Sequence, residues 1–449
     1  MRLFGGDVQK LIRQQRAQRS AIRTPGGPGY SVLILGGGGR EYALAWRLAR
    51  DNSVSSIEIT PGNAGLSLFA RVLDFPPTDG ARIQQHLAAA QIDLGIVGPD
   101  DLIARGLGDD LRRAGISAVG ASREASRLEW SKSFAKEVMD EAGVPTAAWK
   151  AYPTVAAARE ALALRDGPIV IKADGLAAGK GVVVARSRQE ALAALDLAVM
   201  RDGPVVLEEL MEGPECSLQA LVDGETVVAL PPARDHKRVG DGDTGPNTGG
   251  MGAVSPTRVL PDDEAADAAA ELIAPVARTM VKRGMPFRGV IFAGLMRTKA
   301  GFRVIEYNAR FGDPEAQVTL PRIGGDFGRL MFALGQGRLA EHVAQNPLRI
   351  EPRAYVSVAV CAEGYPAAPR AGDAITGLDE LPDGVYAFHA GTKLAPRGGF
   401  LTGGGRVVHI VGGGDTVAEA RAKAYEGARR VKFEGAFYRT DIALAEVSG

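Results

Sequence analysis

The sequence predicts an α/β and α+β protein with three folded domains: an N-terminal parallel-sheet domain, a central domain and a small C-terminal α+β domain. After the first 29 residues come an apolar run at 31–35, four glycines and a helical stretch at 40–48, which is typical of a parallel α/β unit. Later apolar runs alternate with glycine-rich loops. The length of 449 residues corresponds to about three domains of ordinary size.

The composition indicates a globular protein and argues against a polymer partner. Hydrophobic residues make up 45% and charged residues 24%, and a chain this long buries a large core without disulfides or structural metals. The 53 basic side chains balance 53 acidic ones, which argues against a nucleic-acid partner. No apolar run approaches the roughly 20 residues that a membrane span requires. We expect a monomer with no nucleic-acid or membrane partner.

The cysteines and the N-terminus bear on the compartment. Cys216 and Cys361 lie far apart and outside metal-ligand spacing, so we expect no zinc site, and nothing in the sequence supports a disulfide between them. We expect the protein in the cytoplasm, a reducing compartment. Residues 1–29 are predicted to be a flexible basic extension whose one acid is Asp7. Such a start is typical of a transit peptide, but this one lacks serine enrichment and a strong apolar face. A dispensable extension or a misplaced start codon is the favoured interpretation.

The first folded domain, predicted over 30–130, has the pattern of a small-ligand half-site. Strand-like runs at 57–60 and 94–97 each end at a Pro/Gly pair. In open parallel sheets, ligands bind at the carboxyl ends of the strands.

The central domain, predicted over 131–350, contains a candidate phosphate loop. A strand ends at Lys172 and leads into the glycine-rich loop 173–181, whose backbone N–H groups and Lys180 suit phosphate oxygens. Lys132 is a third candidate cation. The loop lacks the P-loop pattern, and alone it equally fits a surface hairpin with solvated lysines.

A candidate metal site follows in the same domain. In the predicted strand 304–308, Glu306 and Asn308 share a face, and their oxygens suit Mg²⁺ or Mn²⁺ carrying nucleotide phosphates. Arg310 would point the same way, toward a phosphoryl oxygen. Alone, this pattern favours an edge strand with its polar face in water. The phosphate loop and the metal pair reinforce one another.

Acidic residues lie at the end of the strand predicted at 205–209 and shortly after it. A backbone hinge after a strand can pair with an adenine edge, and a carboxylate can hold ribose hydroxyls. We therefore assign Glu208, Glu209 and Glu215 to nucleotide binding, although each alone also fits a solvated acid.

The stretch 235–253 is the most unusual part of the chain. It mixes both charge signs with six glycines, whereas a disordered linker usually has low complexity. His236, Lys237 and Arg238 would contact the carboxylate or phosphate of an anionic substrate, and the glycines permit close approach.

The last predicted domain, 351–449, has the pattern of a compact α+β cap. It contains strand-like runs at 356–360 and 407–411 and a helical stretch at 416–430. It shows no obvious nucleophile.

Several motifs, in order and at matching spacing from about Tyr30 to Asp441, resemble the phosphoribosylamine–glycine ligase family of the ATP-grasp superfamily. Together they are far more specific than any one glycine loop. The motifs lie at 38–41, 61–65, 172–181, 235–238, 243–253, 311–315, 388–393 and 404–407.

The resemblance implies an ATP-grasp fold for the central domain and a step of purine synthesis. ATP would phosphorylate the carboxylate of glycine, and the amine of 5-phosphoribosylamine would attack the acyl phosphate. Amide formation from a free carboxylate is uphill in water, so a phosphoryl leaving group is required. No enzyme nucleophile is needed, in keeping with the lack of a Ser–His or Cys–His pattern. Catalysis would rest on positioning and charge neutralisation.

Matched position by position, the resemblance also implies site residues. The metal ligands are Glu306 and Asn308. The catalytic residues are Lys180, Arg310 and Asp313. The ATP site comprises Lys132, Lys172, Gly175, Gly179, Lys180, Gly181, Glu208, Glu209 and Glu215. The glycine and acceptor sites comprise Gly38, Gly39, Arg40, Glu41, Pro61, Gly62, Asn63, Asp235, His236, Lys237, Arg238, Asn247, Thr248, Gly249, Gly250 and Met251.

Departures from the family pattern at Tyr42, Asp100 and Val254 leave alternatives open. The first is another ATP-grasp carboxylate–amine ligase with a different amine or acid. The second, a nucleotide-binding regulator without turnover, is disfavoured because the phosphoryl-transfer residues are complete. The third, a dinucleotide oxidoreductase, fails because Glu41 occupies the third glycine position of its fingerprint.

Overall fold

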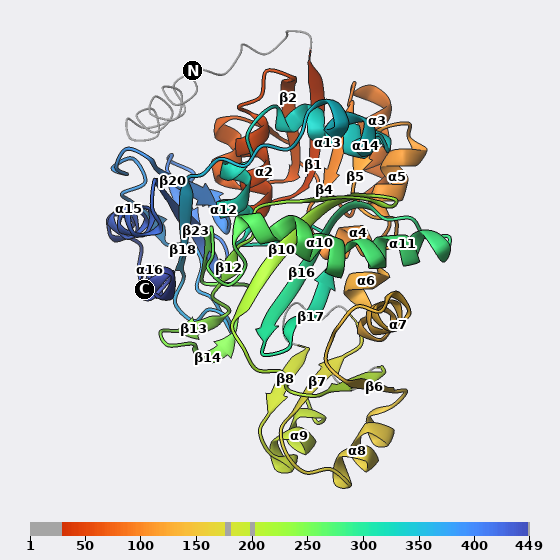
Figure 1. Ribbon diagram of the computed structural model, residues 1–449. Helices are drawn as coiled ribbons and strands as arrows, with labels where there is room; N and C mark the ends of the chain where they lie inside the picture. Colours follow the sequence, from red (N-terminus) through yellow and green to blue (C-terminus); the bar gives the residue numbers. More distant parts are fainter. Residues whose placement is uncertain (1–28, 176–180, 198–202, 448–449) are drawn as a thin grey trace.

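The computed structural model describes residues 29–175, 181–197 and 203–447. Figure 1 shows the N-terminal sheet at one end of the molecule, two further sheets below it, and the C-terminal domain at the side. This mixed α/β architecture, with an N-terminal parallel sheet, confirms the predicted fold class. No helix in the described ranges is long and apolar enough to cross a bilayer.

The N-terminal domain is a parallel sheet with helices packed around it. Its elements are β1 (Tyr30–Gly36), α2 (Gly39–Leu48), β2 (Val54–Pro61), η1 (Ala64–Leu68), β3 (Arg71–Val72), α3 (Gly80–Ala89), β4 (Leu94–Val97), α4 (Asp100–Ala104), α5 (Leu107–Arg113) and β5 (Ser117–Val119). The strand order is β3-β2-β1-β4-β5. Residues 32–35 of β1 are apolar and buried, as expected of a central parallel strand. A topological switch point therefore lies between the carboxyl ends of β1 and β4.

The central domain contains two antiparallel sheets. The smaller, in the order β6-β9-β7-β8, lies at the bottom of Figure 1 with its two helices. The helices α6 (Arg127–Trp130) and α7 (Lys132–Ala142) lead into this sheet. The sheet and its two helices are formed by β6 (Trp149–Tyr152), α8 (Val155–Ala163), β7 (Ile169–Ala173), β8 (Val182–Ala185), α9 (Arg188–Ala194) and β9 (Val205–Glu208). Ser131 caps the N-terminus of α7, and its side chain accepts a hydrogen bond from Phe134 N.

The larger central sheet has the order β11-β10-β16-β17. Its strands and helices are β10 (Glu215–Asp223), β11 (Thr226–Ala229), η3 (Asp262–Glu264), α10 (Ala265–Leu272), α11 (Ala274–Lys282), β16 (Arg288–Thr298), β17 (Gly301–Asn308), α12 (Ala316–Thr319), η4 (Leu320–Arg322), α13 (Phe327–Gln336) and α14 (Leu339–Gln345). The α13 helix packs against β5, so the chain returns to the N-terminal domain after completing this sheet.

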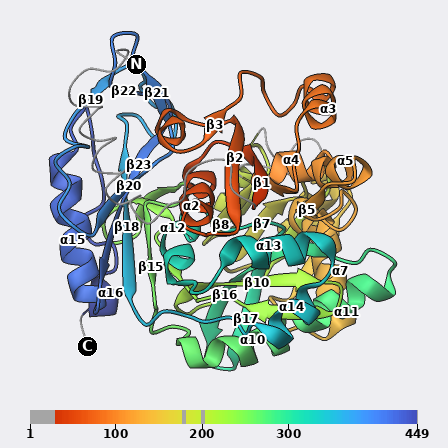
Figure 2. The ribbon, with the colours of Figure 1, turned by 90° about the horizontal axis from the view of Figure 1, so that it is seen from above.

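The C-terminal domain includes strands from the polar stretch 235–253, which lies earlier in the chain. Its elements are β12 (Arg234–Asp235), β13 (Arg238–Gly240), β14 (Thr244–Asn247), β15 (Gly252–Ser255), β18 (Ala354–Cys361), β19 (Ala374–Ile375), β20 (Val385–His389), β21 (Thr392–Leu394), β22 (Phe400–Thr402), β23 (Arg406–Gly414), α15 (Val417–Arg430) and α16 (Leu444–Val447). The main sheet has the order β12-β15-β18-β23-β20, with α15 against β18 and β23. Figure 2 shows this domain along one side of the molecule, beside α2.

Candidate active site

A buried carboxylate lies between two lysines in the predicted nucleotide half. Glu208, the last residue of β9, is 3.0 Å from Lys172 Nζ and 3.1 Å from Lys136 Nζ. Lys172 Nζ also donates to Ile305 O on β17 at 3.0 Å, so the two central sheets meet at this lysine. Burial lowers the pKa of Lys136 to about 8, although Glu208 opposes the shift. The sequence analysis missed Lys136, which lies one helical turn after Lys132.

The start of the glycine-rich loop contacts Lys132, the first residue of α7. Lys132 Nζ donates to Gly175 O at 2.5 Å. Burial lowers the pKa of this lysine. Gly181 directly precedes β8, whereas Gly179 and Lys180 lie outside the described residues.

The two predicted metal ligands, Glu306 and Asn308, lie two residues apart on β17 and therefore on one face. Burial alone would raise the pKa of Glu306, but four nearby cations lower it: Lys172, Lys237, Lys132 and Arg310. No hydrogen-bond or ion-pair partner of the Glu306 carboxylate is found within the described ranges. An ionised carboxylate free of a direct partner, beside an amide oxygen, fits a hard divalent ion whose other ligands are phosphate oxygens and water.

Arg310 follows the metal pair and is held by a glutamate from α6. Its Nη2 donates to Asn308 Oδ1 at 3.0 Å and lies 3.1 Å from Glu129 Oε1. Burial raises the pKa of Glu129, and Arg310 opposes that shift. Glu129 Oε2 also accepts a hydrogen bond from Ala309 N at 2.8 Å. The sequence analysis missed Glu129, because only the fold brings it beside Arg310.

The two remaining acids of the predicted nucleotide site form ion pairs. Glu209 Oε1 accepts a hydrogen bond from Ala148 N at 3.0 Å and lies 3.0 Å from Arg303 Nη1. Glu215, the first residue of β10, pairs with Lys237 Nζ at 2.9 Å. The second pair joins a residue of the predicted nucleotide site to one of the predicted substrate site.

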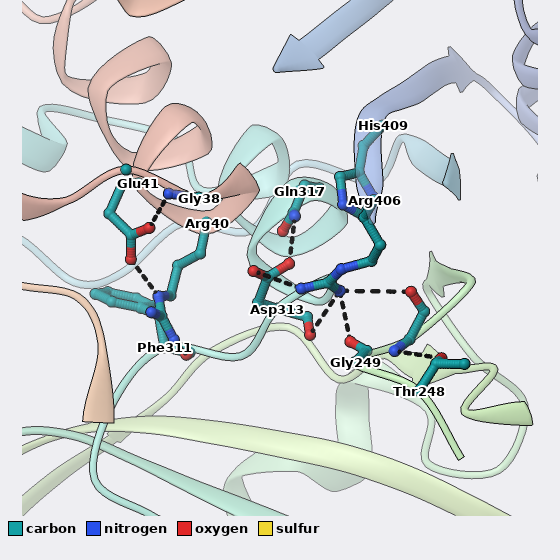
Figure 3. A network of polar contacts seen from close by, with 12 residues as sticks. Gly38, Arg40, Glu41, Thr248, Gly249, Phe311, Asp313, Gln317, Arg406 and His409 are labelled. Atoms are coloured by element: carbon teal, nitrogen blue, oxygen red, sulfur yellow. Dashed lines mark hydrogen bonds and ion pairs between the residues drawn. The ribbon is translucent and has the colours of Figure 1, made fainter. Parts of the chain in front are cut away.

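The glycine turn after β1 is built around the carboxylate of Glu41 (Figure 3). Glu41 Oε2 accepts from Gly38 N at 2.6 Å, and Glu41 Oε1 accepts from Arg40 Nε at 2.6 Å. A side chain on Gly98, directly after β4, would begin 2.0 Å from Glu41 Oε1. The turn therefore lies at the switch point between β1 and β4. Gly39 begins α2, whose N-terminus carries a partial positive charge.

A second predicted turn, after β2, packs against the first. Pro61 ends β2, and a side chain on Gly37 would begin 2.4 Å from Gly62 O. Asn63 Nδ2 donates to Gly37 O at 3.0 Å and to His389 O at 2.9 Å. The amide of Asn63 thus ties the two turns to the C-terminal domain.

The charged motif of the predicted substrate loop divides between two environments. Burial alone would lower the pKa of Lys237, but Asp235 and Glu215 raise it well above its usual value. Burial raises the pKa of Asp235. His236 Nε2 accepts a hydrogen bond from Ala443 N at 3.3 Å, and burial lowers its pKa to about 4. Its neutral imidazole therefore contacts the C-terminal segment.

The rest of this loop runs from the surface into the C-terminal core. Arg238 and Asn247 are paired across the β13–β14 ribbon, where Asn247 is exposed. Thr248 Oγ1 accepts a hydrogen bond from Gly250 N at 2.9 Å. Met251 is fully buried in the C-terminal core.

Asp313 lies where three segments of the chain converge (Figure 3). Its Oδ2 is 2.9 Å from Arg406 Nη2, and its Oδ1 accepts from Gln317 Nε2 at 2.8 Å. Arg406 Nη1 donates to Gly249 O. Burial alone would raise the pKa of Asp313, but Arg406 above all lowers it well below its usual range. The sequence analysis had included Arg406 in a family-like motif without giving it a role.

Comparisons with known proteins agree over most of the chain. The models of phosphoribosylglycinamide synthetase match residues 30–129 (N domain), 130–316 (ATP-grasp domain) and 355–445 (C domain). Phosphoribosylamine–glycine ligase of Rhodopirellula baltica is 42% identical over 428 residues, which cover 92% of this chain and 97% of that protein. The ligase of Brucella melitensis is 43% identical over 423 residues, with coverages of 93% and 98%. The chain belongs to the phosphoribosylamine–glycine ligase family.

Solved structures agree with membership of this family. The crystal structure of phosphoribosylamine–glycine ligase from Thermotoga maritima matches with a TM-score of 0.80 at 34% identity and covers 92% of this chain and 100% of its own. The biotin carboxylase domain of the Hydrogenobacter thermophilus 2-oxoglutarate carboxylase, with a TM-score of 0.66, 18% identity and 92% coverage of both chains, shares the fold alone. The resemblance and the ATP-grasp domain predicted from the sequence are confirmed. The protein is an ATP-dependent ligase, and ATP-grasp ligases use ATP with a divalent metal ion.

Proposed function

We propose that this ligase joins glycine to 5-phosphoribosylamine, giving glycinamide ribonucleotide, ADP and phosphate in purine synthesis. The observation that carries the proposal is the placement of Asp313. This carboxylate follows the strand of Glu306 and Asn308 and borders the glycine turn at Gly38. Arg406 links it to the substrate loop at Gly249. ATP, glycine and 5-phosphoribosylamine can therefore bind close to one another around the ionised carboxylate of Asp313.

Lysine side chains would bind the ATP phosphates. Lys132 and Lys172 lie at the start of the glycine-rich loop, and Lys180 within that loop is proposed to add a third charge. Glu208 would hold Lys172 in place rather than contact the ribose. Glu209 and Glu215 are proposed to border the adenosine.

Glu306 and Asn308 would hold the divalent ion, proposed to be Mg²⁺ or Mn²⁺. A bound ion of this kind neutralises charge on nucleotide phosphates. The lowered pKa of Glu306 supports this assignment, because the carboxylate is ionised at neutral pH.

The proposed chemistry has two steps. A carboxylate oxygen of glycine attacks the γ-phosphorus of ATP, and the bond to ADP breaks, leaving glycyl phosphate. The acceptor nitrogen then attacks the glycyl carbonyl carbon, inorganic phosphate leaves, and the nitrogen loses a proton. Arg310 would stabilise charge on the transferring phosphoryl group. Asp313 would accept a hydrogen bond from the amine of a bound substrate.

The acceptor would occupy the N-terminal half of the site. The N-terminus of α2, which begins at Gly39 directly after Gly38, would offer backbone donors to an anionic group, at the switch point where open α/β sheets bind ligands. The substrate loop around Gly249 would close the site from the other side.

A rival ligase with a different amine has weaker support from the fold. Tyr42 is 1% exposed and stacks on His389, and Val254 is fully buried on β15, so neither side chain is accessible to a substrate. Asp100, at the start of α4, is the departure that acts on the site: burial alone would lower the pKa of Arg40, but Glu41, Asp313 and, least of the three, Asp100 raise it. The alternative of a ligase with a different amine substrate therefore depends on Asp100.

One assay tests the proposal. The enzyme is supplied with ATP, Mg²⁺ and phosphoribosylamine formed from ribose 5-phosphate and ammonia, and phosphate release is measured with and without glycine. We expect release that requires glycine. Release with another amino acid only would favour the rival ligase, and no release would favour a regulator.

Two further proposals have separate tests. Light scattering tests the proposal that the enzyme is a monomer, and cell fractionation tests the proposed cytoplasmic location.

A further inference from the structure

One arginine of the C-terminal domain contacts two segments of the candidate active site. Arg406, the first residue of β23, donates from Nη1 to Gly249 O and lies 3.4 Å from both Gly250 O and Asp313 O. Its Nη2 lies 2.9 Å from Asp313 Oδ2. The guanidinium thus contacts four oxygens, three of them backbone carbonyls (Figure 3).

The turn at 249–250 fits closely against this arginine. A side chain on Gly249 would begin 3.1 Å from Arg406 Cζ, and one on Gly250 would begin 2.4 Å from Pro314. Tyr365, also from the C-terminal domain, accepts a hydrogen bond from Gly249 N at 2.9 Å. Both polar groups of Gly249 are therefore held by the C-terminal domain.

Asp313 extends this connection to the N-terminal domain. A side chain on Gly38 would begin 3.6 Å from Asp313 Oδ2, the oxygen that Arg406 contacts. Asp313 Oδ1 is held by Gln317, so rotation of the carboxylate would break two interactions. The distance and orientation of Asp313 relative to the glycine turn thus depend on Arg406.

We propose that Arg406 is a positioning residue for the acceptor half-site. It fixes the Asp313 carboxylate against the glycine turn, and it also fixes the 249–250 turn. Both are then positioned before the phosphorylated amine binds. The inference rests on the proposed function for the identity of the acceptor. Lysine at this position would keep the charge but not the planar fork of donors.

Kinetics of Arg406→Met test this inference. Hydrogen bonds to charged groups contribute enough that their loss should raise KM for phosphoribosylamine at least about tenfold. KM for ATP should change by less than about twofold, because Lys132 and Lys172 are untouched. Arg406→Lys should recover part of the loss. The matched control is Arg397→Met, an exposed arginine of the same domain, which should behave as wild type.

Other outcomes are also decisive. An unchanged acceptor KM, or an equal rise in the ATP and acceptor KM values, would overturn the inference. If Arg406→Met does not fold, Tyr365→Phe replaces it and should raise the acceptor KM while sparing the ATP KM.

Hydrogen exchange separates this inference from the proposed function. Exchange at Gly249 N–H should be faster in Arg406→Met whether or not the wild type uses phosphoribosylamine. A wild type without glycine-dependent phosphate release would refute the function alone, whereas unchanged exchange at Gly249 would refute the role of Arg406.

Discussion

Arg310 Nη2 lies 3.1 Å from Glu129 Oε1, so a carboxylate from α6 holds the arginine that follows the proposed metal strand. The side chain of Glu129 is 7% exposed and that of Arg310 is 19% exposed, which limits screening by water. Because Glu129 also accepts a hydrogen bond from Ala309 N, one carboxylate fixes both the backbone and the side chain of this turn.

Replacing this carboxylate should impair phosphoryl transfer. In Glu129→Gln the amide retains hydrogen-bonding capacity but loses the charge that orients Arg310. We expect kcat to fall about tenfold, corresponding to the loss of one charge-assisted hydrogen bond. Steady-state kinetics measure the effect, with Glu137→Gln, an exposed glutamate on α7, as the control. A kcat equal to that of the control would show that Arg310 needs no such partner.

Glu306→Gln tests the metal assignment. The change removes the charged ligand and leaves four cations around a neutral amide. We expect turnover to fall about 100-fold or more at ordinary Mg²⁺, because a hard divalent ion prefers a carboxylate oxygen. Activity is measured over a range of Mg²⁺ and Mn²⁺ concentrations, beside Glu225→Gln from the exposed β10–β11 turn. Wild-type turnover in Glu306→Gln would remove Glu306 from the metal site.

Features encoded within a few neighbouring residues could be predicted from the sequence. The strand, glycine turn and helix at 30–48 follow from a local change of hydrophobic period, and the structure contains them as β1 and α2. The shared face of Glu306 and Asn308 follows from the two-residue period of a strand. In both cases the information lies within one or two elements.

Features that depend on distant segments could not be predicted in this way. Lys136 and Glu129 carry no local signal, and the motif that contains Arg406 gave that residue no role. Each of the three meets its partner only after separate elements pack together. The polar stretch 235–253 was expected to be a substrate loop, yet it also contributes β12 and β15 to the C-terminal sheet. Short strands of this kind are defined by their neighbours rather than by their own hydrophobic pattern.

His389 should make the protein sensitive to acid. Burial lowers its pKa to about 3, so below pH 6.5 the unfolded chain takes up a proton that the folded protein excludes. Stability is therefore lost as the pH falls from 6.5 toward the folded pKa. In His389→Asn this loss is absent, so the destabilisation caused by the substitution should shrink by about 2 kcal/mol between pH 7.5 and pH 5. Urea unfolding at the two pH values measures it, and equal destabilisation at both would contradict the prediction.

The β13–β14 ribbon should loosen when its contact with Arg439 is removed. Arg439 Nη1 donates to Arg238 O at 3.0 Å and lies 2.8 Å from Asp243 Oδ1, while residues 244–247 are exposed. Because the ribbon is held largely by such polar contacts, Arg439→Met should speed hydrogen exchange across the ribbon about tenfold, the loss expected for one charge-assisted hydrogen bond. Mass spectrometry of the exchanged peptides measures the effect against Arg430→Met, an exposed substitution on α15. Exchange at the control rate would mean that the pairing of β13 with β14 holds the ribbon without the C-terminal segment.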